Sequence, residues 1–102
     1  RAGHGSRIEM VPVDEVLVFE AADKYVRVLT AAREHLIRTP IAELLAQLDP
    51  DQFWQVHRAT IVNLAQLAGT RRDDASRLFV RFQGLTRELP VSRAYVARFK
   101  AM

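Results

Sequence analysis

The stretch VLVFEAADKYVRVLT (residues 16–30) contains two apolar runs that are separated by the polar pair Asp23-Lys24. In the second run, Val26 and Val28 lie two positions apart, with the polar Arg27 between them. Successive side chains of a β-strand point to opposite faces, so this alternation predicts a strand. The short separation of the two runs predicts that they form an antiparallel hairpin.

Short runs of the same kind continue along the chain. They occupy residues 8–11, 35–38, 53–58, 61–64, 77–83 and 86–89. Gly84 lies between the last two runs, which indicates a second hairpin. The polar residues 71–74 are expected to form the turn that precedes it. The sequence therefore predicts antiparallel β-sheets built from short strands.

Two segments depart from the strand pattern. The apolar residues of the first recur at i, i+3, i+4 and i+7, which makes one face of a helix: they are Ile41, Leu44, Leu45 and Leu48. Thr39 is expected to cap this helix, and Pro40 is tolerated at its first position. Near the C-terminus, Ser92 is expected to cap a short helix with Val96 and Phe99 pointing inward. We expect a mostly β fold with one short helix mid-chain, covering a sheet, and a short C-terminal helix.

The chain has 102 residues and 49% hydrophobic content, which suits one domain with its own core. Residues 1–7 are expected to be a linker or a cloning remnant, and residues 8–102 the folded domain, as a fragment of a longer protein. The absence of cysteine excludes cysteine-ligated zinc and thiol catalysis, and it fits a cytoplasmic protein. No apolar run approaches the roughly 18 residues of a membrane span, so no membrane partner is expected.

Charge is distributed unevenly along the chain. Residues 1–51 contain 6 Lys or Arg and 9 Asp or Glu, which gives −3, whereas residues 52–102 contain 9 and 3, which gives +6. Thirteen of the 15 cations are arginine, whose forked guanidinium binds phosphates and guanine edges. The asymmetry indicates that the second half faces a polyanion, and the alternative is an ordinary solvated surface. Arg71, Arg72 and Arg77 are expected to be surface charge, partly compensated by Asp73 and Asp74.

The residues do not favour an enzyme. The four glycines are isolated, so there is no phosphate-binding glycine loop. The histidines His4, His35 and His57 are far apart and lack metal-ligand spacing. The serines Ser6, Ser76 and Ser92 lie outside any nucleophile-elbow motif. We expect no catalytic residue, no metal and no cofactor.

The common nucleic-acid-binding modules do not fit either. A helix-turn-helix needs two adjacent helices, but the mid-chain helix is flanked by strands. Single-strand binders of the RRM or cold-shock type need aromatic residues clustered on neighbouring strands, and no such cluster is present. A nucleic-acid ligand would have to be bound by loops or strand ends.

Three blocks of the sequence carry a family resemblance. The most specific block is Phe53-x-x-Val56-His57-Arg58-x-x-Ile61-Val62-Asn63. Before it stand DEVLVFEA (residues 14–21) and KYV (24–26), and after it stand LPVSR-x-Y (89–95) and FK (99–100). In this order and spacing, the blocks resemble the LytTR family, the DNA-binding output domains of many bacterial response regulators. The resemblance covers residues 8–100, nearly the whole chain.

The resemblance implies a LytTR-type fold of packed antiparallel β-sheets, whose loops enter successive major grooves of double-stranded DNA and bend it. It implies DNA-binding residues at these positions: Lys24, Tyr25, Arg27, His57, Arg58, Thr60 and Arg93. Among them, Lys24 and Arg93 are expected to read base edges, whereas Arg58 and Thr60 hold the phosphate backbone.

The resemblance also implies partners for the longer protein. It implies a transcriptional regulator with an N-terminal receiver domain, a cognate histidine kinase that drives its phosphorylation, and a dimer on direct-repeat promoter sites. Two departures from the family pattern bear on the contacts. Ala59 stands where the family commonly has serine, which removes a hydroxyl donor to phosphate. Ala22-Asp23-Lys24 replaces a Gly-Asn type of turn, so that Asp23 would face the phosphates unless a cation pairs with it.

Several residues have a structural alternative to a DNA contact. His57 could be a core histidine bonded to a backbone carbonyl, Asn63 a turn-stabilising amide and Trp54 a packing residue. Lys24 could be a solvated turn residue, as could Arg58 in its loop. Arg93 could be tied to a carboxylate at the helix start. For the domain as a whole, the alternatives are a β-rich protein-interaction module and an RNA-binding module.

Overall fold

The computed structural model of the chain describes residues 11–100. The predicted linker at 1–7 and most of the predicted strand at 8–11 lie outside these residues, and Val11 itself is not in a strand. The strands run in the order β1 (Val16–Ala21), β2 (Val26–Thr30), β3 (Glu34–Ile37), β4 (Phe53–His57), β5 (Thr60–Asn63), β6 (Leu67–Arg72), β7 (Leu78–Phe82) and β8 (Leu89–Pro90). The helices are α2 (Ile41–Gln47) and α3 (Arg93–Lys100), with short 3-10 turns η1 (Val13–Glu15) and η2 (Leu64–Gln66). The predicted mostly β class with two short helices is confirmed.

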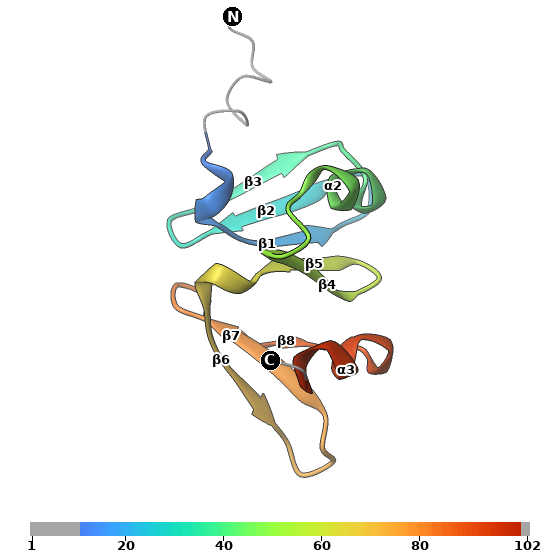
Figure 1. Cartoon of the computed structure of the whole chain (residues 1–102). Helices are drawn as coiled ribbons and strands as arrows, with labels where there is room; N and C mark the ends of the chain where they lie inside the picture. Colours follow the sequence, from blue (N-terminus) through green and yellow to red (C-terminus); the bar gives the residue numbers. More distant parts are fainter. Residues whose placement is uncertain (1–10, 101–102) are drawn as a thin grey trace, which may run out of the picture.

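The strands form two antiparallel sheets, which Figure 1 shows one above the other. The larger sheet has the strand order β3-β2-β1-β5-β4, and the smaller has the order β6-β7-β8. The hairpin predicted from residues 16–30 is present as β1 and β2. On its other side, β1 pairs with β5, with Glu20 opposite Thr60. The turn that leads into β5 therefore lies beside the C-terminal end of β1, next to the β1–β2 turn.

The central strand β1 is buried on both faces and contains a bulge. Val16 and Val18 pair with consecutive residues of β2, which leaves Leu17 as an extra residue. An extra residue changes which side chains share a face of the sheet. Leu17 and Val18 both pack into the core shared with the three-stranded sheet, whereas Val16 and Phe19 pack into the core beneath α2. The bulge therefore places two consecutive residues, Leu17 and Val18, in the same core.

Helix α2 covers the other face of the five-stranded sheet, as its apolar spacing predicted. Ile41 and Leu44 are buried, and they pack in one cluster with Phe19 and Phe53. The predicted cap at Thr39 is wrong. The residue at the N-cap is Pro40, which has no side-chain hydrogen bond to offer, and the helix begins one residue later than its capping pattern suggested.

The predicted turn at 71–74 is wrong in its first half, because Arg71 and Arg72 belong to β6. The chain turns at 73–77, where the Asp73 N–H donates to the Arg77 carbonyl at 3.1 Å. Strand β6 lies at the edge of its sheet, and only Leu67 and Gly69 of it are even half-buried. With so little apolar surface to bury, the strand carries no alternating pattern in its sequence.

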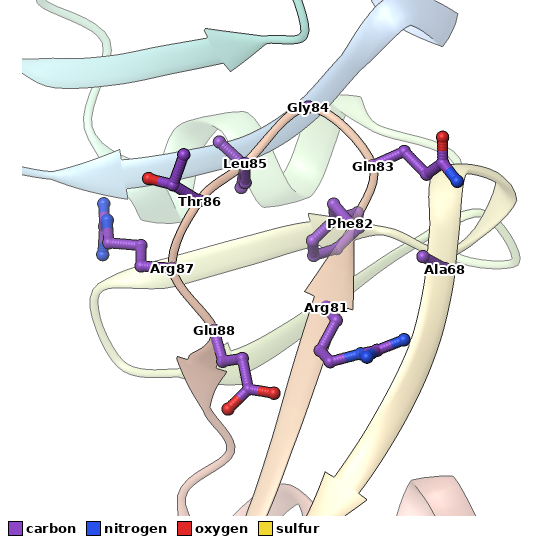
Figure 2. A pocket seen from close by; sticks show the side chains of 9 residues that line it. All are labelled: Ala68, Arg81, Phe82, Gln83, Gly84, Leu85, Thr86, Arg87 and Glu88. Carbon is purple, nitrogen blue, oxygen red and sulfur yellow. The ribbon is translucent and has the colours of Figure 1, made fainter.

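The second predicted hairpin is present, but its return strand is β8 rather than residues 86–89. Residues 83–88 form a loop that borders a shallow depression beside β7 (Figure 2). The loop is tied to the five-stranded sheet, because the Arg87 guanidinium lies 2.7 Å from the Glu20 carboxylate of β1. The return strand β8 begins only after this loop, at Leu89.

The same loop passes close to the β2–β3 turn at Gly84. Its φ of 95° is one that residues with a Cβ rarely adopt, and a Cβ built there would lie 2.8 Å from the Cβ of Ala31. Glycine is required for both reasons. The predicted turn glycine is therefore also a point of contact between the two sheets.

Helix α3 packs on β4 through aromatic residues. The rings of Trp54 and Phe99 meet edge to face with centroids 5.2 Å apart, and the Arg98 guanidinium lies 4.4 Å from the centre of the Trp54 ring. Val96 and Phe99 pack against the core as predicted, and Trp54 is confirmed as a packing residue. Within residues 11–100, no helix is long and apolar enough to cross a membrane.

Candidate nucleic-acid interface

Three segments that carry expected contact residues lie on one side of the molecule, at the right in Figure 1. They are the β1–β2 turn, the β4–β5 turn and the start of α3, and we call their residues 22–25, 58–59 and 93 the turn edge. Two backbone hydrogen bonds hold them together. The Ala21 N–H donates to the Ala59 carbonyl at 2.7 Å, and the Ser92 N–H donates to the Val56 carbonyl at 2.7 Å. Strand β4 and its turn therefore fix the position of the other two segments.

The β1–β2 turn presents Lys24 and Tyr25 to solvent. The Ala22 N–H donates to the Tyr25 carbonyl at 2.7 Å, which closes the turn. Both side chains line a shallow depression that Arg58 also lines from the β4–β5 turn. Asp23 lines it as well, and no cation within residues 11–100 forms an ion pair with this carboxylate. The structure thus brings two predicted contacts, Lys24 and Arg58, to one place.

The β4–β5 turn is held by side chains of β4. His57 is half-buried, and its Nδ1 accepts the Ala59 N–H at 3.2 Å. The Gln55 amide donates to the Arg58 carbonyl at 3.4 Å. The imidazole therefore bonds a backbone N–H and not the carbonyl that the structural alternative envisaged. Arg58 itself is exposed at the tip of the turn.

Thr60 and Arg27 have less surface available for a ligand. Thr60 is 7% exposed at the start of β5. The Arg27 guanidinium lies 3.7 Å from the Glu20 carboxylate and 3.6 Å from that of Glu34. Burial limits what Thr60 can touch, and neighbouring carboxylates offset the charge of Arg27.

Arg93 is the first residue of α3, and its side chain is exposed. No carboxylate within the described part of the chain forms an ion pair with Arg93. The alternative, in which Arg93 is tied to a carboxylate at the helix start, is therefore not supported by these residues. Because Ser92 is bonded to Val56, Arg93 projects from a point two residues before Arg58 along β4. Both arginines therefore belong to the same side of the molecule.

Some other cations of the described residues are paired with carboxylates. In the three-stranded sheet, Arg71 lies 2.7 Å from Glu88, and Arg77 lies 2.8 Å from Asp73. The hydrogen bond from Arg71 lowers the pKa of the Glu88 carboxyl. The pKa of Asp73 is lowered chiefly by the backbone N–H of Arg77, with its guanidinium adding to the effect. Arg71 and Arg77 are surface charge compensated by carboxylates, but the partner of Arg71 is Glu88 and not one of the expected aspartates. Arg72 donates to the Ser76 carbonyl and forms no ion pair within the described residues.

Asn63 supports the fold at the end of β5, whereas Arg38 lies on the surface beside the turn edge. Asn63 is fully buried, where its amide donates to the Asp14 and Val16 carbonyls and its oxygen accepts the Ala65 N–H. Asn63 therefore stabilises the fold, as the structural alternative to a DNA contact predicted. Arg38, which sequence reasoning missed, lines the depression beside Lys24, with its guanidinium 5.5 Å from the centre of the Tyr25 ring. No local sequence pattern predicts the contact between Arg38 and Tyr25, because the two residues lie in different connecting segments.

Comparisons with known proteins match both the sequence and the fold of the chain. A family model described as the LytTr DNA-binding domain matches residues 6–102. An uncharacterized response regulatory protein of Vibrio cholerae is 39% identical, over 98% of this chain and 39% of that protein. The CO-responsive transcriptional regulator RcoM of Rhodospirillum rubrum is 37% identical, over 98% of this chain and 42% of that protein. Among solved structures, the LytTr DNA-binding domain of a Bacillus cereus protein described as a methyl-accepting/DNA response regulator has a TM-score of 0.79 at 26% identity, covering 89% of this chain and 83% of that one.

The chain spans 39% and 42% of the length of these two curated relatives, so it corresponds to one part of each. The family model covers nearly all of it, and the same architecture recurs in the solved structure. The chain belongs to the LytTr DNA-binding domain family.

Proposed function

We propose that the domain binds double-stranded DNA sequence-specifically and that the turn edge is the surface that meets the duplex. The observation that carries this proposal is that Lys24 and Arg58 line one depression, while Arg93 starts a helix whose preceding residue, Ser92, is bonded to Val56 of the neighbouring strand. None of these three cations forms an ion pair within residues 11–100. Cations without carboxylate partners are available to replace the counterions of DNA phosphates.

The position of each residue suggests its role. Arg93 projects from the start of a helix, so its guanidinium can reach a base edge in the major groove, where guanine O6 and N7 are its preferred partners. Lys24, at the tip of the β1–β2 turn, is the second candidate for reading bases. Arg58 lies between them, and we assign it a phosphate contact that sets the register of the domain on the duplex.

The remaining predicted residues act mainly as supports in this proposal. His57 holds the Ala59 N–H and so keeps Arg58 in position. Arg27 lies next to the contact surface, but its charge is shared with Glu20 and Glu34. Thr60 is retained as a phosphate contact only through the small exposed part of its side chain.

We further propose that the domain is the output part of a cytoplasmic transcriptional regulator that binds direct-repeat sites as a dimer. An N-terminal receiver domain served by a histidine kinase is the arrangement that the Vibrio relative, named a response regulatory protein, supports. The Rhodospirillum relative is named CO-responsive, so a gas-sensing input is the competing arrangement. The sequence that precedes the domain in the longer protein would distinguish the two.

Selection of bound sequences from random duplex DNA tests the proposed activity. We expect the 102-residue chain to enrich one short motif, and labelled duplex carrying that motif to be displaced by unlabelled duplex of the same sequence. Effective displacement by single-stranded RNA would favour an RNA-binding module instead. Failure to enrich any motif, together with binding that is insensitive to salt, would favour a protein-interaction module.

A further inference from the structure

The depression on the turn edge is lined by cations from three different turns. Lys24 comes from the β1–β2 turn, Arg58 from the β4–β5 turn, and Arg38 from the segment between β3 and α2. Asp23 is the one carboxylate that lines it among the described residues. Three cations and one carboxylate leave a charge of +2, which suits a single anionic group better than an apolar ligand.

The three cations are also free of carboxylate partners. Within residues 11–100, the ion pairs of the chain involve Arg27, Arg71, Arg77 and Arg87. These ion pairs include none of the three cations that line the depression, and all three are exposed: Lys24, Arg38 and Arg58. Cations held near one another repel, so an anion between them would relieve an unfavourable interaction.

Arg38 has a defined position although it has no ion-pair partner. Its guanidinium lies 5.5 Å from the centre of the Tyr25 ring, within the range of a cation–π contact. A guanidinium stacked on a ring keeps the N–H groups at its rim available for a phosphate. Tyr25 is 37% exposed, so its ring can hold Arg38 at the surface of the depression.

We propose that this depression holds one phosphate group of the DNA backbone, bound jointly by Arg38, Arg58 and Lys24. This inference rests on the proposed function and deepens it, because it adds Arg38 as a DNA contact. It also makes Tyr25 a positioning residue that acts through Arg38 rather than a residue that reads bases. In this inference Lys24 contacts the phosphate with its ammonium group instead of reading bases, which leaves Arg93 as the base reader.

Neutralising single phosphates of the DNA tests whether the cations share one group. The probe is a set of duplexes that carry the selected motif, each with one phosphate replaced by an uncharged methylphosphonate. For the parent chain, we expect one replacement at the depression to weaken binding by about tenfold, since hydrogen bonds to charged groups contribute strongly. In Arg38→Gln and in Arg58→Gln, the same replacement should weaken binding clearly less than it does in the parent, because one of the three cations that contact the phosphate is already gone.

Arg33→Gln is the matched control. Arg33 is an exposed arginine in the β2–β3 turn, at the opposite end of β2 from Tyr25. This variant should show the full loss on methylphosphonate replacement, as the parent does. If Arg38→Gln behaves like Arg33→Gln at every phosphate, the proposal is wrong.

A double-mutant cycle tests the role of Tyr25. Tyr25→Phe keeps the ring and should bind like the parent, whereas Tyr25→Leu removes it and should weaken binding. In the Arg38→Gln background, Tyr25→Leu should have no additional effect. Equal effects of Tyr25→Leu in both backgrounds would show that Tyr25 contacts DNA independently and would overturn its positioning role. Thermal unfolding of each variant establishes that the fold is retained.

The outcomes separate this inference from the proposed function. If Arg58→Gln and an Arg93→Gln variant lose affinity while Arg38→Gln does not, the turn edge still binds DNA, and only the three-cation phosphate site is refuted. If none of these three variants differs from the Arg33→Gln control, the proposed surface itself is wrong.

Discussion

The arginines of the turn edge differ from Arg71 and Arg77 at the three-stranded sheet, although Arg72 and Arg81 of that sheet also form no ion pair within the described residues. In the sheet, Arg71 and Arg77 lie within 2.8 Å of carboxylates, whereas Arg58 and Arg93 at the turn edge form no ion pair with any residue in the range 11–100. The net charge of +6 in residues 52–102 includes both groups. Charge counted along the sequence therefore overstates the cationic surface there, and it misses Lys24 and Arg38, which come from the acidic half. The availability of a cation for a ligand is decided by its carboxylate neighbours in three dimensions.

The largest contrast is expected between Arg93 and Arg77. Replacing Arg93 by Ala should cost about 1–3 kcal/mol of binding free energy on the selected motif and relax the preference at one base pair. Arg77→Ala, which removes an arginine already paired with Asp73, should leave affinity within about 0.5 kcal/mol of the parent. Titration of both variants with labelled duplex measures the difference, and equal losses would remove the distinction between the two regions.

The attachment between the two sheets can be weakened without touching the turn edge. Gly84→Ala places a Cβ against Ala31 and forces an unfavourable φ, so we expect it to lower the free energy of unfolding by about 1–3 kcal/mol. Urea unfolding measures this loss. At temperatures where the variant remains folded, its affinity for the selected duplex should equal that of the parent. A large loss of affinity in the folded variant would show that the three-stranded sheet takes part in DNA binding.

A smaller effect is expected from Arg58, and it should depend on salt. Each phosphate contact contributes about 0.9 to the slope of log affinity against log salt concentration. Arg58→Ala should reduce the slope by this amount on selected and random duplexes alike. Its disadvantage relative to the parent should then be about threefold greater at 50 mM than at 200 mM salt. Arg71→Ala is the matched variant from the sheet, and an equal change in its slope would contradict the comparison.

The smallest effect concerns the carboxylates that compensate the sheet arginines. The pKa of Glu88 is lowered in the folded state by Arg71, and that of Asp73 by the N–H and guanidinium of Arg77. A lowered folded-state pKa stabilises the fold above the unfolded value, which is about 4.3 for glutamate and 3.9 for aspartate. This stabilisation is lost as the pH falls through the folded-state values. Urea unfolding between about pH 7 and pH 3 should show the loss, and Glu88→Gln should reduce its pH dependence. A parent stability that rises on acidification through this range would contradict the assignment.

The parts of the fold that sequence predicted are those with local patterns. The 16–30 hairpin, the apolar face of α2 and the alternation in β7 each arise from residues a few positions apart. Strand β6 was missed because an edge strand with one half-covered face needs few apolar residues. The late start of β8 was missed because residues 83–88 form a loop whose contact with the five-stranded sheet, between Arg87 and Glu20, joins residues 67 positions apart.

The same distinction applies to the site. The family resemblance predicted DNA contacts at Lys24, Arg58 and Arg93, and the pairing of β1 with β5 explains why Lys24 and Arg58 line one depression. The ion pairs that hold Arg27 and the burial of Thr60 depend on neighbours across the sheet, which no spacing in the chain encodes. Arg38 was missed for the same reason, since its ring partner lies in another turn.

The position of the duplex on the domain can be mapped directly by NMR. The ¹⁵N-labelled chain would be titrated with the selected duplex while the backbone amide shifts are followed. Large shift changes should gather at residues 22–25, 58–59 and 93–94, and the amides of 70–77 should stay close to their free positions. Changes concentrated at 70–77, with the turn edge unaffected, would place the DNA on the compensated arginines and contradict the account.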